Sequence, residues 1–412
     1  MRNPAQAVRA LLAHPGTQHA FHLARELDRR NFLSFFFTSI SFRSGGLIEK
    51  ISVYASDSIR KRVVARALPG TFSAQLKTRP RLEAAAQWRL FRGSNEQEVL
   101  QRRNDAFQRS IPDRALQKAN IVIGVDTASA ILAERCKSLD RPFVLDQSIG
   151  HPDAKQAMHD RMQGLFPQWT EGFEKRRPEV RAAEIKEQTL ATAIVTATSF
   201  AKRTMVENGV AADKIQVIPY GVDAQRFSVR KSDENQPFRF AFAGLLTARK
   251  GIPILLEAWE QFASSGAELW LIGPASQSAL TLLPQLRGIR RVGAVSQEEM
   301  VRLLNQCDVF VFPSFFEGFG LVILEAMACG LPVITTTATA GPDVITQGED
   351  GWILEPGDRD GLLRAMEFCL ENRKSVSDMG AKARETAERF SWKVYGDRWA
   401  ELLEQVRLAV RC

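Results

Sequence analysis

The sequence predicts an α/β protein made of two doubly wound, Rossmann-like domains, each built around a parallel sheet. Short apolar runs alternate with helical patterns along the chain, which is the order of βαβ units. The 412 residues exceed what one hydrophobic core usually serves, so two domains of roughly 200 residues each are expected. A polar stretch at 228–237, ending in proline, suits an exposed linker between them.

The predicted strands fall in both halves of the chain. In the first half they are 8–13, 32–40, 120–125, 142–145 and 193–196, and in the second half 215–218, 238–243, 268–272, 308–312, 332–335 and 352–354. The domains are expected at 1–225 and 226–395, followed by a closing helix at 396–412. That helix carries an apolar stripe that would dock on another surface: Trp399, Leu402, Leu403, Val406 and Leu408.

Composition favours an ordinary globular protein of a reducing compartment. The chain is 45% hydrophobic and 25% charged, and its cysteines form no close pair of the kind that marks zinc or dithiol sites. They are Cys136, Cys307, Cys329, Cys369 and Cys412. The first residues lack the apolar stretch of a secretory signal, and the most apolar segment, 32–42, is short and interrupted by polar residues. We therefore expect a cytoplasmic protein without a membrane span or a metal site.

The most informative segment is 308–336, which predicts strand, glycine loop, helix, glycine turn and strand. This arrangement brings a ligand to the carboxyl end of the sheet, beside the N-terminus of a helix. Gly318 and Gly320 would let backbone N–H groups approach ligand oxygens closely. Glu317 enters the loop and Glu325 lies eight residues later, inside the helix.

A nucleotide-sugar has chemical needs that these residues match. Its hydroxyl groups call for acceptors, which carboxylates provide, and its diphosphate calls for positive charge and N–H donors. The loop at 243–251 (AGLLTARKG) follows another predicted strand and contains Arg249 and Lys250. Arginine can hold two phosphate oxygens, whereas lysine acts as a point charge.

Three segments together resemble one known family. They are EGFGLVILEAMACGLPVI, AGLLTARKGIPILLEAW and SFAKRTMVENGVAADKIQVIPYGVD. They are similar to glycosyltransferase family four, the retaining nucleotide-sugar transferases of the GT-B fold, and the resemblance covers nearly all of 190–400. It implies two Rossmann-like domains facing each other across a cleft, with a C-terminal helix that crosses back to the first domain. It implies no cofactor, because the nucleotide-sugar is the donor substrate.

The resemblance also assigns roles to residues of the second half. Glu317 would contact the transferred sugar and Glu325 the nucleotide ribose, while backbone groups of Gly318, Phe319 and Gly320 would face the sugar and the phosphates. The family often has arginine after the glycine that matches Gly244, but this chain has Leu245, so Arg249 is expected to substitute beside Lys250. Gly244, Gly273 and Val292 would complete the donor pocket. The implied mechanism passes through an oxocarbenium-like state without a strong protein nucleophile, so the cations and loop amides stabilise the leaving diphosphate.

The first half resembles the family more loosely. Its loop at 14–18 (HPGTQ) corresponds to the family's glycine-rich loop at the mouth of the cleft, with Gly16 and Thr17 at that position. Many members carry a histidine after the strand equivalent to 142–145, where it faces the donor sugar. This chain reads LDQSIGHP there, and three residues stay open for that place: His151 first, then Gln147 and Asp146.

The formal charge of +8 is concentrated in one segment. Between 59 and 92 a single acid, Glu83, faces nine basic residues: Arg60, Lys61, Arg62, Arg66, Lys77, Arg79, Arg81, Arg89 and Arg92. Three interpretations remain: peripheral contact with anionic lipid on the inner face of the cytoplasmic membrane, a site for an acidic acceptor, or a solvated surface. The first two suit a glycan or lipid-linked acceptor.

Two other functions compete with glycosyl transfer. A nucleic-acid-binding protein would use the charge, but no recognition motif appears, and we expect no nucleic-acid partner. A nucleotide-sugar hydrolase, an epimerase or a sugar-binding protein without transfer activity would keep the same donor site. Acceptor-dependent release of nucleotide separates a transferase from these proteins.

Overall fold

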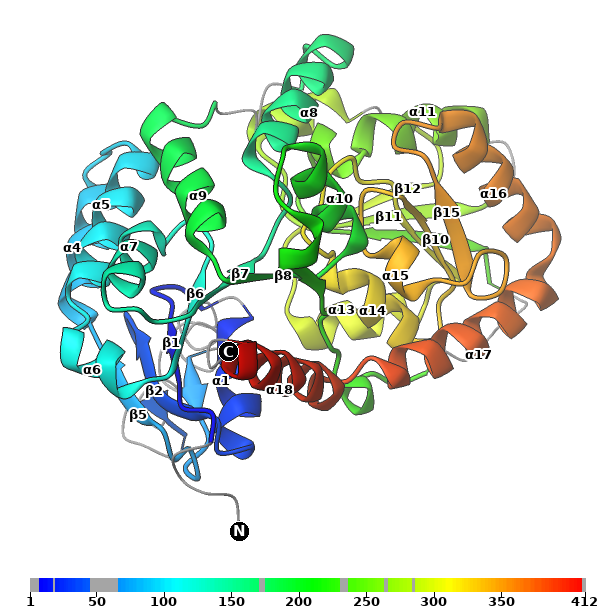
Figure 1. Ribbon diagram of the computed structural model, residues 1–412. Helices are drawn as coiled ribbons and strands as arrows, with labels where there is room; N and C mark the ends of the chain where they lie inside the picture. The colour runs from blue at the N-terminus through cyan, green and yellow to red at the C-terminus, as the bar shows by residue number, and fades with distance from the viewer. Residues whose placement is uncertain are drawn as a thin grey trace.

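The protein consists of two layered α/β domains that lie side by side (Figure 1). The computed structural model describes residues 7–17, 19–44, 66–169, 175–229, 236–262, 266–283 and 286–409. Each domain has one parallel sheet, and the chain passes from the first sheet to the second between β9 (Ile215–Val217) and β10 (Arg239–Ala243). The two doubly wound sheets that the alternating pattern predicted are therefore present.

The first sheet is parallel, with the order β5-β2-β1-β6-β7-β8-β9 among the described residues. Its strands are β1 (Ala10–Ala13), β2 (Leu33–Thr38), β5 (Gln75–Thr78), β6 (Ile121–Val125), β7 (Phe143–Gln147), β8 (Ala193–Thr196) and β9. A separate short pair joins β3 (Phe42–Arg43) to β4 (Ala67–Leu68). Every residue of β1, β6, β7 and β8 is buried, because helices cover both faces of the sheet. Phe35, Phe36 and Phe37 are buried in β2, as expected for strand core.

Helices connect these strands and shape the first domain. They are α1 (Ala20–Arg29), α4 (Pro80–Phe91), α5 (Glu96–Arg109), α6 (Asp113–Lys118), α7 (Ala130–Ser138), α8 (Pro152–Leu165), α9 (Pro178–Leu190) and α10 (Ser199–Glu207). In Figure 1, α4, α5 and α6 form the outer side of this domain, whereas α8 and α10 lie toward the second domain. In the described part of the chain, no helix has both the length and the apolarity to cross a membrane.

The second sheet is also parallel, with the order β12-β11-β10-β13-β14-β15 among the described residues. Its strands are β10, β11 (Glu268–Ile272), β12 (Ile289–Val292), β13 (Val309–Phe312), β14 (Val333–Thr336) and β15 (Gly351–Leu354). The connecting helices are α11 (Ile252–Phe262), α12 (Gln277–Leu282), α13 (Gln297–Leu304), α14 (Leu321–Ala328), α15 (Gly341–Val344), α16 (Arg359–Glu371) and α17 (Arg373–Arg389). A short 3-10 turn, η4 (Ala248–Lys250), carries Arg249 and Lys250.

The sequence did not predict β5 and β12, which are end strands of the two sheets. Both contain charged residues and have exposed side chains, so neither gives an apolar run. The strand predicted at 215–218 belongs to the first sheet as β9. In the linker expected at 228–237, residues 230–235 lie outside the described residues, as do Cys412 and Arg60, Lys61 and Arg62 of the basic segment.

The closing helix, α18 (Trp392–Ala409), crosses back to the first domain, as the family resemblance implied. Arg30 of α1 donates hydrogen bonds to the carbonyl oxygen of Lys393 at 2.9 Å and to Asp397 Oδ1 at 2.5 Å. A side-chain carbon at Gly396 would lie 2.5 Å from Cβ of Glu26, so this glycine permits the close helix contact. Of the predicted apolar stripe, four residues are buried and Leu408 is exposed, because it lies on the last turn.

Candidate functional site

A glycine loop joins β13 to α14 and lies directly against the first domain. Gly320 has a φ of +83°, a left-handed conformation that glycine adopts readily. A side-chain carbon at Gly318 would lie 2.0 Å from the carbonyl oxygen of Ser148, just after β7. The loop therefore lies where the carboxyl ends of the two sheets approach each other, which is where ligands bind in open α/β sheets.

Glu317, in this loop, is the centre of a compact charged cluster. Its Oε1 atom lies 2.8 Å from Arg249 Nη1 and 2.5 Å from Lys250 Nζ. The hydroxyl of Ser314 donates a third contact to the same atom at 2.8 Å. Arg249 Nη1 also donates to the carbonyl oxygen of Phe316 at 2.6 Å, so the arginine is held along the loop. The structure thus brings together Glu317, Arg249 and Lys250, which the sequence proposed from two separate segments.

The electrostatics of the cluster follow from burial and charge together. Burial alone would raise the pKa of Glu317, but the charges of Arg249 and Lys250 outweigh it and lower that pKa. Burial is also the main cause that lowers the pKa of Lys250, and the nearby Arg249 adds to the effect while Glu317 opposes it. The carboxylate is ionised at neutral pH and balances positive charge that a diphosphate could balance instead.

Gly244 and Gly273 lie next to each other at the ends of β10 and β11. Their φ angles are +147° and +142°, and a side-chain carbon at Gly273 would lie 2.0 Å from the carbonyl oxygen of Gly244. The N–H of Gly273 donates to the carbonyl oxygen of Val292 in β12 at 2.9 Å. These three residues, which the resemblance assigned to the donor pocket, are therefore neighbours at one end of the second sheet.

Glu325 lies half-buried on α14, in the turn before its end. Gln297 Nε2 of α13 donates a hydrogen bond to its Oε1 atom at 3.2 Å. Burial raises the pKa of Glu325, and the Gln297 contact partly offsets this. Its environment thus differs from that of Glu317, because among the described residues no Lys or Arg forms an ion pair with it. Such a carboxylate can accept hydrogen bonds from hydroxyl groups.

Residues at the start of α10 hold the first domain against the second, at the glycine loop and at α15. Thr198 Oγ1 donates to the carbonyl oxygen of Gly318 at 3.2 Å. The N–H of Ser199 donates to Asp343 of α15 at 2.9 Å. The rings of Phe200 and Phe316 pack edge to face with centroids 5.0 Å apart. These contacts fix the loop between the domains.

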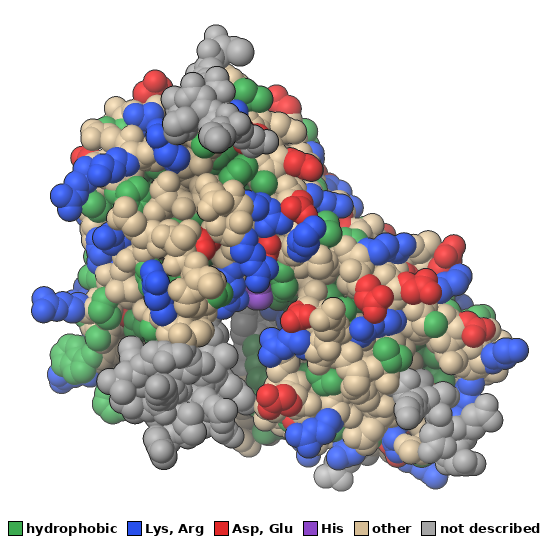
Figure 2. Space-filling view, turned by 90° about the horizontal axis from the view of Figure 1, so that it is seen from below, with side chains coloured by type: hydrophobic (Ala, Val, Ile, Leu, Met, Phe, Trp, Pro, Cys, Tyr) green, Lys and Arg blue, Asp and Glu red, His purple; other side chains and the backbone are tan. Residues whose placement is uncertain are grey.

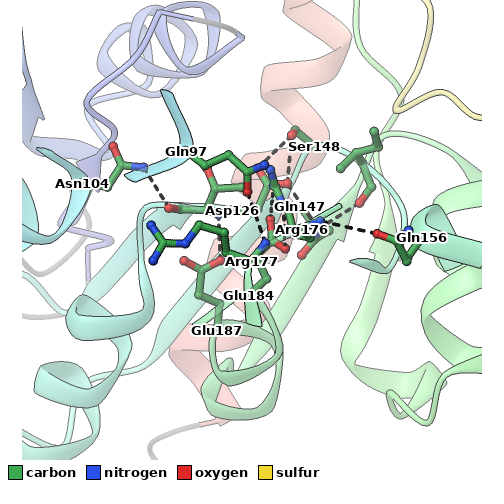
Figure 3. Close-up of polar contacts among 12 residues, drawn as sticks. Gln97, Asn104, Asp126, Gln147, Ser148, Gln156, Arg176, Arg177, Glu184 and Glu187 are labelled. Atoms are coloured by element: carbon green, nitrogen blue, oxygen red, sulfur yellow. Dashed lines mark hydrogen bonds and ion pairs between the residues drawn. The ribbon is translucent and has the colours of Figure 1, made fainter. Parts of the chain in front are cut away.

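A cavity of about 540 Å³ opens in the first domain beside this loop. Gly16 and Thr17, predicted from the loop after β1, both line it, and so do residues of α5, α8 and α9. Figure 3 shows polar side chains gathered there from several elements, among them Asn104, Gln147 and Arg176. The polar walls suit a ligand rich in hydrogen-bonding groups.

The structure separates the three residues that stayed open after β7. Gln147 lines the cavity and donates to Asp126 Oδ2 at 3.3 Å and to the carbonyl oxygen of Ile149 at 2.9 Å. Asp146 is buried and lies 2.6 Å from His19 Nε2. His151 caps the N-terminus of α8, where its Nδ1 accepts from the N–H of Asp153 at 3.2 Å, and it does not line the cavity.

His19 and His22, near the start of the chain, contact side chains from distant parts of the sequence. His19, beside Asp146, also forms a hydrogen bond with the hydroxyl of Tyr220 at 2.9 Å. Burial would lower the pKa of His19, but Asp146 raises it. His22 stacks on Trp392 of α18 with centroids 3.7 Å apart. Among the described residues, His, Cys, Asp and Glu side chains form no group of three suited to a metal ion.

Sequence reasoning missed several residues of the cavity. Lys155 and His159 come from α8, Asn104 from α5, and Arg176 from the segment before α9. His14 also lines the cavity, at the end of β1. The HPGTQ loop could have drawn attention to His14, but nothing in the local pattern of α5 or α8 marks their residues.

Comparisons with known proteins point to one family. Residues 237–372 match the family described as "Glycosyl transferases group 1". The amylovoran biosynthesis glycosyltransferase AmsK of Erwinia amylovora is 28% identical over 217 residues, which cover 49% of this chain and 53% of that protein. A GDP-mannose-dependent mannosyltransferase of Corynebacterium glutamicum, named for a monoacylated phosphatidylinositol monomannoside, is 28% identical over 211 residues, or 45% of this chain and 55% of that protein. The chain spans about half the length of the curated relatives it matches.

The comparison with solved structures concerns the whole chain. HepE of Anabaena, solved in complex with UDP, superposes with a TM-score of 0.62 at 16% identity, over 97% of this chain and all of that one. At this identity the likeness shows the fold alone. The fold is GT-B, with two Rossmann-like domains and a C-terminal helix that returns to the first.

Proposed function

Through residues 237–372 the chain belongs to the group 1 glycosyl transferases, and from this premise we propose that it moves a sugar from a UDP- or GDP-sugar to a glycan or glycolipid acceptor. The observation that carries the proposal is the cluster of Glu317, Arg249 and Lys250 on the glycine loop between the domains. The relatives named for amylovoran and for a phosphatidylinositol mannoside support a role in the synthesis of a surface polysaccharide or glycoconjugate.

In the proposed donor complex, each charged group has one task. Arg249 and Lys250 hold the diphosphate, which takes over part of their interaction with Glu317. Glu317 then accepts hydrogen bonds from hydroxyl groups of the transferred sugar, and Glu325 accepts them from the nucleotide ribose. Backbone groups of Gly318, Phe319 and Gly320 face the sugar and the phosphates, since the glycines leave the backbone accessible.

We propose that the transfer is retaining and independent of metal ions. As the bond to the sugar breaks, negative charge grows on the leaving diphosphate, and Arg249 and Lys250 are fixed where they can stabilise it. Arg249 is tied to the carbonyl oxygen of Phe316 and needs little reorganisation to do so. Stabilising charge by preorganised cations is the task that a divalent ion performs in other transferases.

The basic face of the first domain supports peripheral contact with an anionic membrane through 59–92. In the described part of that segment, α4 exposes 58% of Trp88 and 90% of Phe91. Arg81 and Arg89 are exposed on the same helix, while Glu83 is buried and paired with Arg103 at 3.0 Å. Figure 2 shows Lys and Arg side chains among hydrophobic ones along the left edge, the side on which Figure 1 has α4. Exposed aromatic and basic side chains together suit a lipid headgroup surface.

The experiment measures release of UDP or GDP from a panel of nucleotide-sugars, with and without a bacterial envelope extract as the acceptor source. We expect release from one donor that rises with the extract. Glu325→Ala should lower it at least about tenfold, because a charge-assisted hydrogen bond contributes about 1.5–3 kcal/mol. Glu367→Ala, at an exposed position of α16, is the matched control and should leave it unchanged.

The alternative functions make different predictions in the same experiment. Release that does not depend on the extract indicates a hydrolase. Binding without release indicates a sugar-binding protein that lacks transfer activity. If no donor is bound or released, the proposed function is wrong.

A further inference from the structure

The cavity in the first domain contains a buried histidine that has no hydrogen-bond partner among the described residues. His14 is 5% exposed and lines the cavity, and within this part of the chain neither Nδ1 nor Nε2 has a partner. Its backbone is fixed because its N–H donates to the carbonyl oxygen of Phe37 at 3.0 Å, extending β1 along β2. Burial lowers the pKa of His14 to about 3, so the ring is neutral and offers one donor and one acceptor. Such a buried group costs about 1–3 kcal/mol until a partner binds.

Lys155 of α8 also lines the cavity and brings a positive charge to it. Among the described residues, no carboxylate forms an ion pair with it. Glu184, which also lines the cavity, forms an ion pair with Arg176, whose Nε lies 3.3 Å from Glu184 Oε2. Burial lowers the pKa of Lys155, and the charges of Arg176 and Arg249 add to the effect. Glu184 and Asp126 oppose that effect. Lys155 is therefore a cation of the cavity wall without an ion-pair partner among the described residues, within electrostatic reach of Arg249 in the donor site.

Polar groups in the remaining walls are held in place by hydrogen bonds. Thr127 has a φ of +68°, an uncommon conformation for a residue with a branched side chain. Its N–H donates to Glu187 Oε2 at 2.9 Å, and its carbonyl oxygen accepts from Asn104 Nδ2 at 3.0 Å. Figure 3 shows the hydrogen bond that Asn104 donates, and also the contact of Gln156 with Arg176, which holds the segment before α9. Strained residues held from several sides are typical of ligand sites.

We propose that this cavity binds the acceptor and selects a sugar that carries a carboxylate or a phosphate, with Lys155 holding the negative group and His14 a hydroxyl group. The inference rests on the proposed glycosyl transfer, and it names the chemical class of the acceptor. Lys155 satisfies an anion, the neutral His14 satisfies a hydroxyl, and the amide side chains around them bind further hydroxyl groups. Lys155 and His14 are then specificity-determining residues of the acceptor site.

The test measures binding of four probes to the full chain by calorimetry: glucose, glucuronate, glucose 6-phosphate and inorganic phosphate. We expect glucuronate and glucose 6-phosphate to bind at least about tenfold more tightly than glucose, with inorganic phosphate weaker than either. Lys155→Met should remove the preference for the charged sugars. Arg161→Met, which removes a charge from an exposed position of the same helix, should keep it. His14→Phe should weaken all three sugars by a similar factor.

Several results would overturn the inference. Equal binding of glucose and the charged sugars, or no binding of any probe, excludes selection of an anionic sugar. Inorganic phosphate as tight as glucose 6-phosphate indicates a simple anion site. A preference that survives Lys155→Met excludes Lys155 as its cause. UDP or GDP binding is measured on the same variants: if Lys155→Met weakens nucleotide binding and leaves the sugar probes unchanged, Lys155 belongs to the donor site. Nucleotide binding in wild type also separates failure of this inference from failure of the proposed function.

Discussion

Glu317 and His14 represent two ways in which this protein keeps a polar side chain buried. Glu317 receives Arg249, Lys250 and Ser314 on a single oxygen, which compensates for the loss of water around its charge. In the described part of the chain His14 has no such partners, and it stays neutral. The first arrangement is suited to exchange one anion for another, and the second is completed only by a ligand.

The buried neutral state of His14 predicts a dependence of stability on pH. Its pKa of about 3 in the folded protein lies below the ordinary histidine value of 6.5, so between these values the unfolded chain binds a proton that the folded chain does not. The stabilising effect is therefore complete above pH 6.5 and is lost as pH falls toward 3. Between pH 7.5 and 5.0, the unfolding free energy of wild type should therefore fall by about 2 kcal/mol more than that of His14→Phe.

Urea unfolding at the two pH values measures this difference, because other titrating groups contribute equally in both proteins. Parallel losses of stability in wild type and His14→Phe would contradict the assigned protonation state of His14. The variant should also be no less stable than wild type at pH 5.0, since it removes polar atoms for which the described residues provide no hydrogen-bond partner.

Part of the candidate site could be predicted from single residues. The motif at 317–325 is one continuous segment, and Arg249 and Lys250 are adjacent in another, so the chemistry of each could be recognised in the sequence. The structure brings Glu317 of the motif together with Arg249 and Lys250. Sequence alone could not tell which residue after β7 reaches the cavity, because that depends on where the side chains of Asp146, Gln147 and His151 point in the fold. Lys155 and Asn104 were missed because their position in the cavity depends on how α8 and α5 pack.

At the scale of elements, α4 is notable for its exposed face. Trp88 and Phe91 are exposed near its C-terminal end, and the guanidinium of Arg92 lies 4.9 Å from the ring centroid of Trp88. The helix packs against α5, whose other residues line the first-domain cavity. A membrane bound at α4 would therefore lie one helix away from the proposed acceptor site.

This arrangement predicts binding to vesicles that contain phosphatidylglycerol and much weaker binding to phosphatidylcholine vesicles. Arg89→Glu should weaken the binding about fivefold or more, because each basic residue near an anionic surface contributes about 1 kcal/mol. The double variant Trp88→Ala and Phe91→Ala should weaken it further. Leu408→Ala, at another exposed apolar residue, and Arg302→Glu, at an exposed arginine of the second domain, are the controls.

Vesicle cosedimentation provides the measurement. If the α4 variants and the two controls bind anionic vesicles equally, α4 is a solvated surface.

Among the strands, the buried ones could be predicted from the sequence because their apolar runs are continuous. The end strands β5 and β12 could not, since Lys77 and Arg290 interrupt those runs and pairing along one edge is enough to form them.

At the scale of the whole molecule, the two domains are joined on both sides of the glycine loop. Asp343 accepts from Ser199 on one side, and on the other Tyr220 contacts both His19 and Phe319. The return of α18 to α1 adds a further connection. The two-domain fold could be predicted because alternating strands and helices repeat through the chain. The interdomain contacts could not, because they join residues about a hundred or more positions apart.

The most direct test of the account is a calorimetric titration of the intact protein with UDP and with GDP. The central claim is that Arg249 and Lys250, now balanced by Glu317, hold the diphosphate of a nucleotide-sugar donor. We predict that one of the two nucleotides binds with one-to-one stoichiometry and that Lys250→Met weakens it about tenfold or more, whereas Lys374→Met, at an exposed position of α17, does not. Failure of both nucleotides to bind, or equal binding by wild type and Lys250→Met, would contradict the claim.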